Sequence, residues 1–189
     1  MFKIILISVV GVLLACSNSK QVEVSKNQAE KFDVVINATT TQVYCGGASP
    51  TEEILEELKT PNPASNVYLY LRKGDTNFIE KEIDYQLKTD DSGQVKISLP
   101  VGTYSIVFEN KKDISVYNEL IEKYGKGTSY QTAIDTNCLK SYFKQPNAIL
   151  KVEENGENTI TVNRKMHCQW TRIPCSHYKG DLPPSAPPK

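Results

Sequence analysis

The amino-acid sequence predicts an all-β fold: a seven-stranded, antiparallel-type β-sandwich with two short helices in its insertions. From Phe32 onward, apolar residues recur at every second position, which is the period of strands that bury one face. Residues typical of turns separate these runs. The length of 189 residues, with 39% apolar and 23% charged residues, suits one domain with additional segments.

Seven runs show the alternation and are predicted strands. The inward-facing positions of the seven runs are Phe32, Val34, Ile36 and Ala38; Val67, Leu69 and Leu71; Ile79, Ile83, Tyr85 and Leu87; Val95, Ile97 and Leu99; Tyr104, Ile106 and Phe108; Ala148, Leu150 and Val152; Ile160 and Val162. Asp91-Ser92-Gly93 favours a type I turn with a glycine bulge, and Asn155-Gly156 favours a tight hairpin.

Two helices are predicted between these strands. Ser49-Pro50-Thr51-Glu52 has the pattern of a capping box with proline at the first helical position, and Ile54, Leu55 and Leu58 follow on one face. A second helix is expected from about Ser115 to Gly125. Its apolar stripe consists of Val116, Leu120, Ile121 and Tyr124.

The N-terminal segment predicts export. Residues 1–15 combine Lys3, an apolar run and small residues before Cys16, which is the layout of a signal peptide. Leu13-Leu14-Ala15-Cys16 resembles the bacterial lipobox, and this resemblance implies that Cys16 becomes the first mature residue and carries lipid such as palmitate. The alternative is an ordinary signal peptide that precedes a chance cysteine.

Residues 16–31 are polar and lack periodicity, so we interpret them as a flexible tether between a lipid anchor and the folded domain. No aspartate follows Cys16 directly, and by the lipobox resemblance the outer membrane is the favoured location. The 22 basic and 22 acidic residues give a formal net charge of zero. This balance offers no electrostatic case for nucleic acid as a partner.

Two adjacent segments resemble a known family. Thr89–Val95 and Leu99–Tyr104 look like the T-D-x-x-G and L-P-x-G-x-Y signature of carboxypeptidase regulatory-like domains, and Pro63–Val67 resembles a segment of their transthyretin-like (prealbumin-like) relatives. The resemblance implies an immunoglobulin-like sandwich over residues 32–166 with an insertion at 111–146, followed by an extension at 167–189. It also implies a non-catalytic module of bacterial envelope assemblies.

Four cysteines follow Cys16, and an even number in an exported chain predicts two disulfides. Four cysteines allow three connectivities. In transthyretin-like sandwiches the first strand and the penultimate or last strand lie in one sheet with the same direction. The resemblance therefore implies that Cys45 pairs with Cys168, which leaves Cys138 for Cys175.

Two chemical alternatives concern the extension. His167, Cys168, Cys175 and His177 are residue types that bind zinc, although adjacent side chains of an extended segment point to opposite faces. A transthyretin-like hydrolase is the second alternative. Tyr178-Lys179-Gly180-Asp181 resembles the end of that enzyme only superficially, and no histidine precedes His167. We therefore expect no catalytic residue and no cofactor.

Aromatic residues are the candidate binding residues. Tyr68 and Tyr70 are predicted on the outer face of a strand, where they could stack on a sugar or contact a protein; alternatively they form cross-strand pairs or lie beneath the insertion. The insertion adds Tyr117, Tyr124, Tyr130, Tyr142 and Phe143. The proline-rich residues 182–189 are either a solvated tail or a segment that a partner binds. The sequence thus predicts a lipid-anchored envelope module that binds glycan or protein without turnover.

Overall fold

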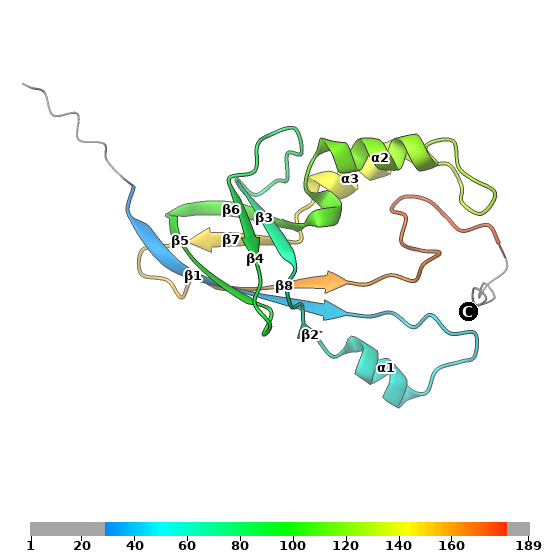
Figure 1. Ribbon diagram of the computed structural model, residues 1–189, viewed down its shortest axis with the longest axis horizontal. Helices are drawn as coiled ribbons and strands as arrows, with labels where there is room; N and C mark the ends of the chain where they lie inside the picture. Colours follow the sequence, from blue (N-terminus) through cyan, green and yellow to red (C-terminus); the bar gives the residue numbers. More distant parts are fainter. Residues whose placement is uncertain (1–28, 181–189) are drawn as a thin grey trace, which may run out of the picture.

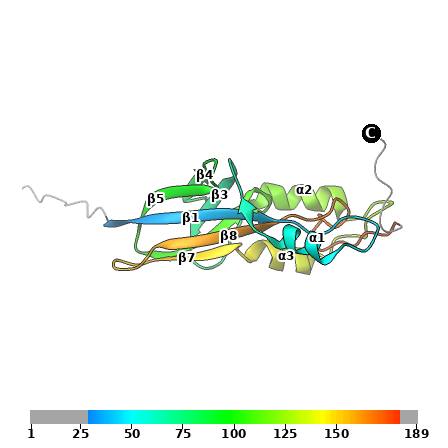
Figure 2. The same cartoon turned by 90° about the horizontal axis from the view of Figure 1, so that it is seen from below.

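The computed structural model describes residues 29–180. This part of the chain is mostly β, with two four-stranded sheets, three α-helices and one short 3-10 helix. The strands occupy one half of an elongated molecule, and the helices lie toward the other half (Figures 1 and 2).

The first sheet is organised around β1 (Lys31–Thr41). On one edge β1 pairs antiparallel with β5 (Gln94–Pro100) and, further along, with β2 (Asn62–Pro63). On the other edge it pairs parallel with β8 (Thr159–Lys165). The first and last strands therefore run side by side in the same direction.

The second sheet is antiparallel throughout, in the order β4-β3-β6-β7. Its strands are β3 (Tyr68–Lys73), β4 (Tyr85–Lys88), β6 (Gly102–Phe108) and β7 (Ala148–Val152).

One hydrophobic core is shared by both sheets, which gives a sandwich-like arrangement. The first sheet and its connections contribute Val34, Ile36, Ala38, Ala64, Leu99 and Val162, and the second contributes Leu69, Leu71, Tyr104, Ile106, Phe108, Leu150 and Val152. All but Ala64 are inward-facing positions of the predicted strands. The period-two pattern is confirmed at these residues, although β3 and β6 also bury residues of their other face, such as Tyr70, Arg72 and Val107.

The third predicted strand is only partly present. β4 begins at Tyr85, whereas Ile79 and Ile83 lie in the connection from β3. The Asn77 side chain donates hydrogen bonds of 2.9 Å to the carbonyls of Lys111 and Phe143, and these bonds draw the connection toward the insertion. With the two-residue β2 included, the described residues contain eight strands rather than the predicted seven.

One predicted turn is confirmed and the other is wrong. Gly93 N–H donates to the Asp90 carbonyl at 3.1 Å with a φ of +77°, and an added Cβ there would lie 2.6 Å from the Ala38 carbonyl oxygen. Asn155-Gly156 forms no hairpin, because β7 and β8 belong to different sheets. The Asn158 side chain instead closes this connection by bonding both the N–H and the carbonyl of Glu153.

The helices also differ from the prediction. α1 (Glu52–Lys59) begins after Thr51, whose hydroxyl accepts from the Ile54 N–H at 3.4 Å, so the predicted capping box starting at Ser49 is wrong. α2 (Ile114–Tyr124) lies close to its predicted position and is capped by Asp113. The structure adds η1 (Glu109–Lys111) and a third helix, α3 (Thr136–Lys144), which the sequence analysis did not predict.

The two ends of the long axis differ in character. The start of β1 lies at one end, whereas α1, α2, α3 and the C-terminal segment lie toward the opposite end (Figures 1 and 2). No helix within residues 29–180 has the length and apolar character needed to cross a membrane.

Candidate functional site

Residues 109–146 and 166–180 pack together as a unit, which we call the helical module. It has a hydrophobic cluster of its own, separate from the core between the sheets. The buried members of this cluster are Ile79, Ile134, Leu139, Phe143 and Ile173. Ile79 comes from the β3–β4 connection, which therefore belongs to the same unit.

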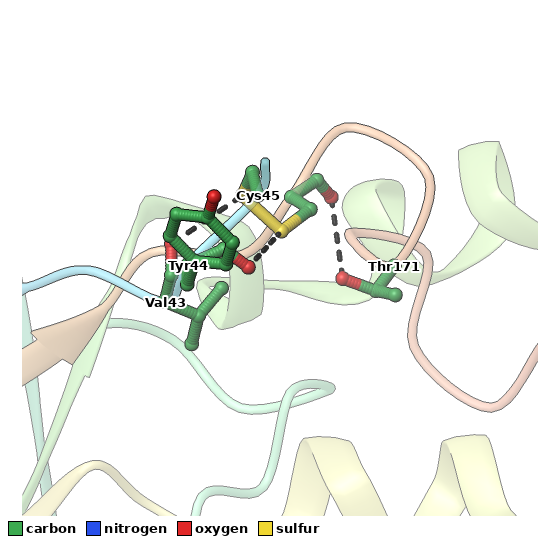
Figure 3. Close-up of a disulfide and its surroundings, with 5 residues drawn as sticks. Val43, Tyr44, Cys45 and Thr171 are labelled. Atoms are coloured by element: carbon green, nitrogen blue, oxygen red, sulfur yellow. Dashed lines mark hydrogen bonds between the residues drawn. A yellow bond between two sulfur atoms is a disulfide. The ribbon is translucent and has the colours of Figure 1, made fainter. Parts of the chain in front are cut away.

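Two disulfides fasten the module. Cys45 is bonded to Cys168 with 5.5 Å between their Cα atoms, and Cys138 is bonded to Cys175 with 5.7 Å. These are the pairings that the family resemblance implies. Figure 3 shows the first bridge beside Tyr44. It joins the segment after β1 to the segment after β8.

Backbone hydrogen bonds join the insertion to the C-terminal segment. Thr132 N–H donates to the His177 carbonyl at 2.8 Å, and Asp135 N–H donates to the Cys175 carbonyl at 3.0 Å. The side chain of Gln131 is 8% exposed and donates to the Trp170 carbonyl at 2.9 Å. The extension is thus part of the folded module up to Gly180.

The buried side chain of Arg72 connects the module to the second sheet. Arg72 on β3 is 2% exposed and donates to the Lys81 carbonyl at 3.0 Å, to Asn77 Oδ1 at 2.7 Å and to the Lys112 carbonyl. Burial lowers the pKa of Arg72, although nearby carboxylates oppose this shift. Because its donors bind carbonyl oxygens from two segments, Arg72 fixes both segments against the sheet.

A hydrogen bond between Tyr70 and Glu109 is a second connection between the sheet and the module. Tyr70 is 4% exposed, and its hydroxyl donates to the Glu109 carboxylate, which also lies 2.5 Å from Lys112 Nζ. Burial and the hydrogen bond to Glu109 raise the pKa of Tyr70. Desolvation raises the pKa of Glu109, but hydrogen bonds from Lys112 and Tyr70 lower it overall. Tyr70 therefore lies beneath the start of the insertion, as one of the two interpretations expected.

A shallow groove lies beside these residues. Its volume is about 450 Å³, and its lining includes Tyr68, Tyr70, Gln86, Glu109 and Arg164. Tyr68 is 44% exposed and Lys88 Nζ lies 6.0 Å from its ring centroid. The ring centroids of Tyr68 and Tyr70 are 6.5 Å apart, but Tyr68 is the ring that offers an open surface to a ligand.

A second cleft lies where the β3–β4 connection meets α2 and α3, and we call it the apolar cleft. Its volume is about 310 Å³. Buried Ile79 and Phe143 contribute to its lining, together with Phe78 and Ile114, which are 42% and 41% exposed. The remaining lining residues are Asn77, Glu80, Tyr117, Lys140 and Lys144.

The predicted aromatic residues have different surroundings. Tyr117 and Phe143 line the apolar cleft, whereas Tyr124 and Tyr142 are half-buried against the module's cluster. Tyr130 is 64% exposed and stacks on Tyr178 at 6.3 Å. The sequence analysis missed seven cleft residues as binding candidates, because no spacing signal relates the three segments that carry them. They are Asn77, Phe78, Ile79, Glu80, Ile114, Lys140 and Lys144.

Both cysteines of the zinc alternative form disulfides and supply no thiolate. Cys168 and Cys175 are bonded to different cysteine partners, while His167 and His177 are exposed. Within residues 29–180, no group of three histidine, cysteine, aspartate or glutamate side chains is placed to hold a metal ion. Cys16 and the proline-rich residues 182–189 lie outside the described residues.

Comparison with known proteins gives no relative from which a function could be inferred. No family model, no curated protein and no solved structure matches the chain.

Proposed function

We propose that the protein is a lipid-anchored binding or scaffolding module of the bacterial cell envelope, with no turnover of its own. The observation that carries the proposal is that the two ends of the molecule differ along its long axis. The chain enters the sheets at one end of the long axis, and the helical module lies toward the other end (Figure 1). A lipid on Cys16 would thus tether the sheet end and direct the module away from the membrane.

The structural roles of the signature residues support a carboxypeptidase regulatory-like, transthyretin-like sandwich. Thr89 is 2% exposed; its hydroxyl accepts from the Val67 N–H at 3.0 Å and donates to the Ala64 carbonyl at 2.7 Å. The buried Tyr104 donates to the Pro100 carbonyl at 3.0 Å. The parallel pairing of β1 with β8 agrees with the same fold.

The disulfides support export. Disulfides persist in oxidising compartments and are rare in the cytosol. Both bridges join segments outside the sheets. We infer that the outer membrane is the anchoring membrane and that the ligand is an envelope protein or a glycan.

Replacing Cys16 tests the anchor. In Cys16→Ser the lipid-bearing sulfur is absent, so the chain should lose radiolabelled palmitate and leave the membrane fraction. The matched control is Ser17→Ala, which should be labelled and sedimented like the parent chain. A Cys16→Ser chain that is still processed and still sediments with membranes would show that the anchor is wrong.

Site-specific photocrosslinking tests the binding role. A benzophenone side chain at Tyr130, 64% exposed in the module, should crosslink to an envelope component in living cells. The same group at Val101, 52% exposed between β5 and β6, is the control and should crosslink little. Val101 follows Pro100, which pairs with Lys31 at the start of β1. Equal crosslinking at both positions, or none at Tyr130, would contradict a binding role for the module.

A further inference from the structure

We propose that the apolar cleft binds a short acidic, apolar peptide segment of a partner protein. This inference rests on the proposed binding function and assigns it a site and a ligand chemistry. The site is formed by the β3–β4 connection, the first turns of α2 and the last turns of α3.

Two apolar side chains of the cleft, Phe78 and Ile114, are exposed to solvent. Phe78 and Ile114 keep 42% and 41% of their surface exposed, although they adjoin Ile79 and Phe143, which are 8% and 1% exposed. A ligand side chain in the cleft would therefore extend the module's own hydrophobic cluster. The volume of about 310 Å³ is at the lower end of ligand pockets, which suits a few side chains rather than a whole helix.

The charged side chains around the cleft indicate the charge of the ligand. Lys140 and Lys144 are four residues apart on α3, so their side chains share one face of the helix. Lys81 adds a third cation, with its Nζ 4.7 Å from the Phe78 ring centroid. Both ion pairs found among residues 29–180 involve other lysines. Within the lining itself the two lysines outnumber the single carboxylate, Glu80, and the flanking Lys81 and Asp113 carry opposite charges, so the rim favours an anionic ligand.

The cleft is rigid, and this favours a peptide over a lipid surface. Asn77 fixes the β3–β4 connection through two side-chain hydrogen bonds of 2.9 Å, and the Asp113 carboxylate caps α2. A preformed concave site reduces the entropy cost of binding a peptide. A bilayer surface would contact the exposed Phe78 and Ile114, whereas only an inserted side chain reaches the recessed Ile79 and Phe143.

The test measures fluorescence anisotropy with the purified full chain. The probe is a fluorescein-labelled hexapeptide with two leucines flanked by glutamates; the control peptides replace the glutamates by lysines or the leucines by serines. Only the first peptide should bind. Its affinity should fall at least about tenfold in Phe78→Ser and in the double variant Lys140→Glu/Lys144→Glu.

A matched variant separates local from general charge effects. Lys96→Glu/Lys151→Glu makes the same charge change at exposed lysines of β5 and β7 and should keep the parent affinity. All of these side chains are exposed, so the melting temperature should change little in every variant. A melting curve for each variant checks this directly.

Several outcomes would overturn the inference. These are no binding of the acidic, apolar peptide, equal binding of the lysine peptide, or an affinity that the cleft variants leave unchanged. Phosphatidylglycerol vesicles form a separate arm: vesicle binding that disappears in the same variants would assign the cleft to a membrane surface instead. Crosslinking from Tyr130 that persists in the cleft variants would leave the proposed function intact and reject only the cleft as the site.

Discussion

The core between the sheets and the cluster of the helical module stabilise their regions in different ways. Within residues 29–180 the sheet core contains 13 buried residues, all supplied by strands except Ala64. The module's cluster has five buried residues, surrounded by half-buried side chains. A small apolar core contributes less stability, and small folded units commonly compensate with covalent bridges. Cys138–Cys175 lies within the module, as this argument expects.

The two regions also differ in how their buried polar groups are hydrogen-bonded. The sheets satisfy their backbone groups by strand pairing, whereas the segments of the module are also held to one another and to β3 by buried side chains, namely Arg72, Asn77 and Gln131. Each of these three is at least nine-tenths buried and bonds to segments distant in the sequence. Loss of one such bond leaves a buried polar group without a partner, which costs more than the bond itself contributes. We therefore expect the stability of the module to depend on its buried polar contacts, and the stability of the sheet core to depend on its apolar packing.

The same substitution in the two regions should give the largest contrast. Leu71 in the sheet core and Leu139 in the module are both 0% exposed. Leu71→Ala should lower the free energy of global unfolding by about 3–5 kcal/mol, because it removes packing from the shared core. Leu139→Ala should mainly speed hydrogen exchange in the helical module, residues 109–146 and 166–180, and leave the sheet amides protected.

Urea unfolding followed by hydrogen exchange with mass spectrometry measures both effects. If Leu139→Ala accelerates exchange in β1 and β6 as much as in α3, the two regions unfold as one unit and the comparison does not describe the protein.

Removal of the module's bridge should have a smaller and local effect. Cys138→Ser/Cys175→Ser should destabilise the module by about 2–4 kcal/mol, since the bridge closes a sequence separation of 37 residues. Trp170 is the only tryptophan and is half-buried in the C-terminal segment, so its emission should shift to the red as the segment loosens. Far-ultraviolet circular dichroism of the sheets should change little. Unchanged Trp170 emission would show that the Cys45–Cys168 bridge and the hydrogen bonds hold the segment in place without Cys138–Cys175.

The sheet core could be predicted from the sequence because one rule governs it. Burial of one face gives a period of two, and residues such as Val34, Leu69 and Val162 followed that period into the core. The number of disulfides followed from the count of cysteines. The pairing of Cys45 with Cys168 followed from the family resemblance, since the spacing of the cysteines left three connectivities open.

The module could not be predicted in the same way. α3 is short, and its placement depends on Leu139 and Phe143 finding partners in other segments, which no local pattern reveals. Arg72 shares the strand face of Tyr68 and Tyr70, which was predicted to face outward, yet it is 2% exposed because the insertion covers that face of the sheet. The residues of the apolar cleft likewise come from three separate segments. Their proximity is a property of the tertiary fold alone.

The smallest expected effect concerns Lys111, at the junction between the two regions. Its side chain is 6% exposed, donates to the Gln145 carbonyl at 3.0 Å and lies 4.0 Å from the Tyr142 ring centroid. Burial lowers the pKa of Lys111 to about 8 from its usual 10.5. Between these two values the folded chain has released a proton that the unfolded chain still binds, so stability should rise with pH.

The measurement compares unfolding free energies of the parent chain and Lys111→Met from pH 7.5 to 9.5. The parent should gain about 2 kcal/mol relative to the variant over this range, because each unit of pKa displacement corresponds to about 1.4 kcal/mol. The range ends below the titration of Tyr70, whose raised pKa gives the opposite slope above pH 10. Lys144→Met, at an exposed lysine of α3, is the control and should run parallel to the parent. If Lys111→Met also runs parallel to the parent, Lys111 keeps its proton throughout, and the junction tolerates a buried ammonium group stabilised by Tyr142 and the Gln145 carbonyl.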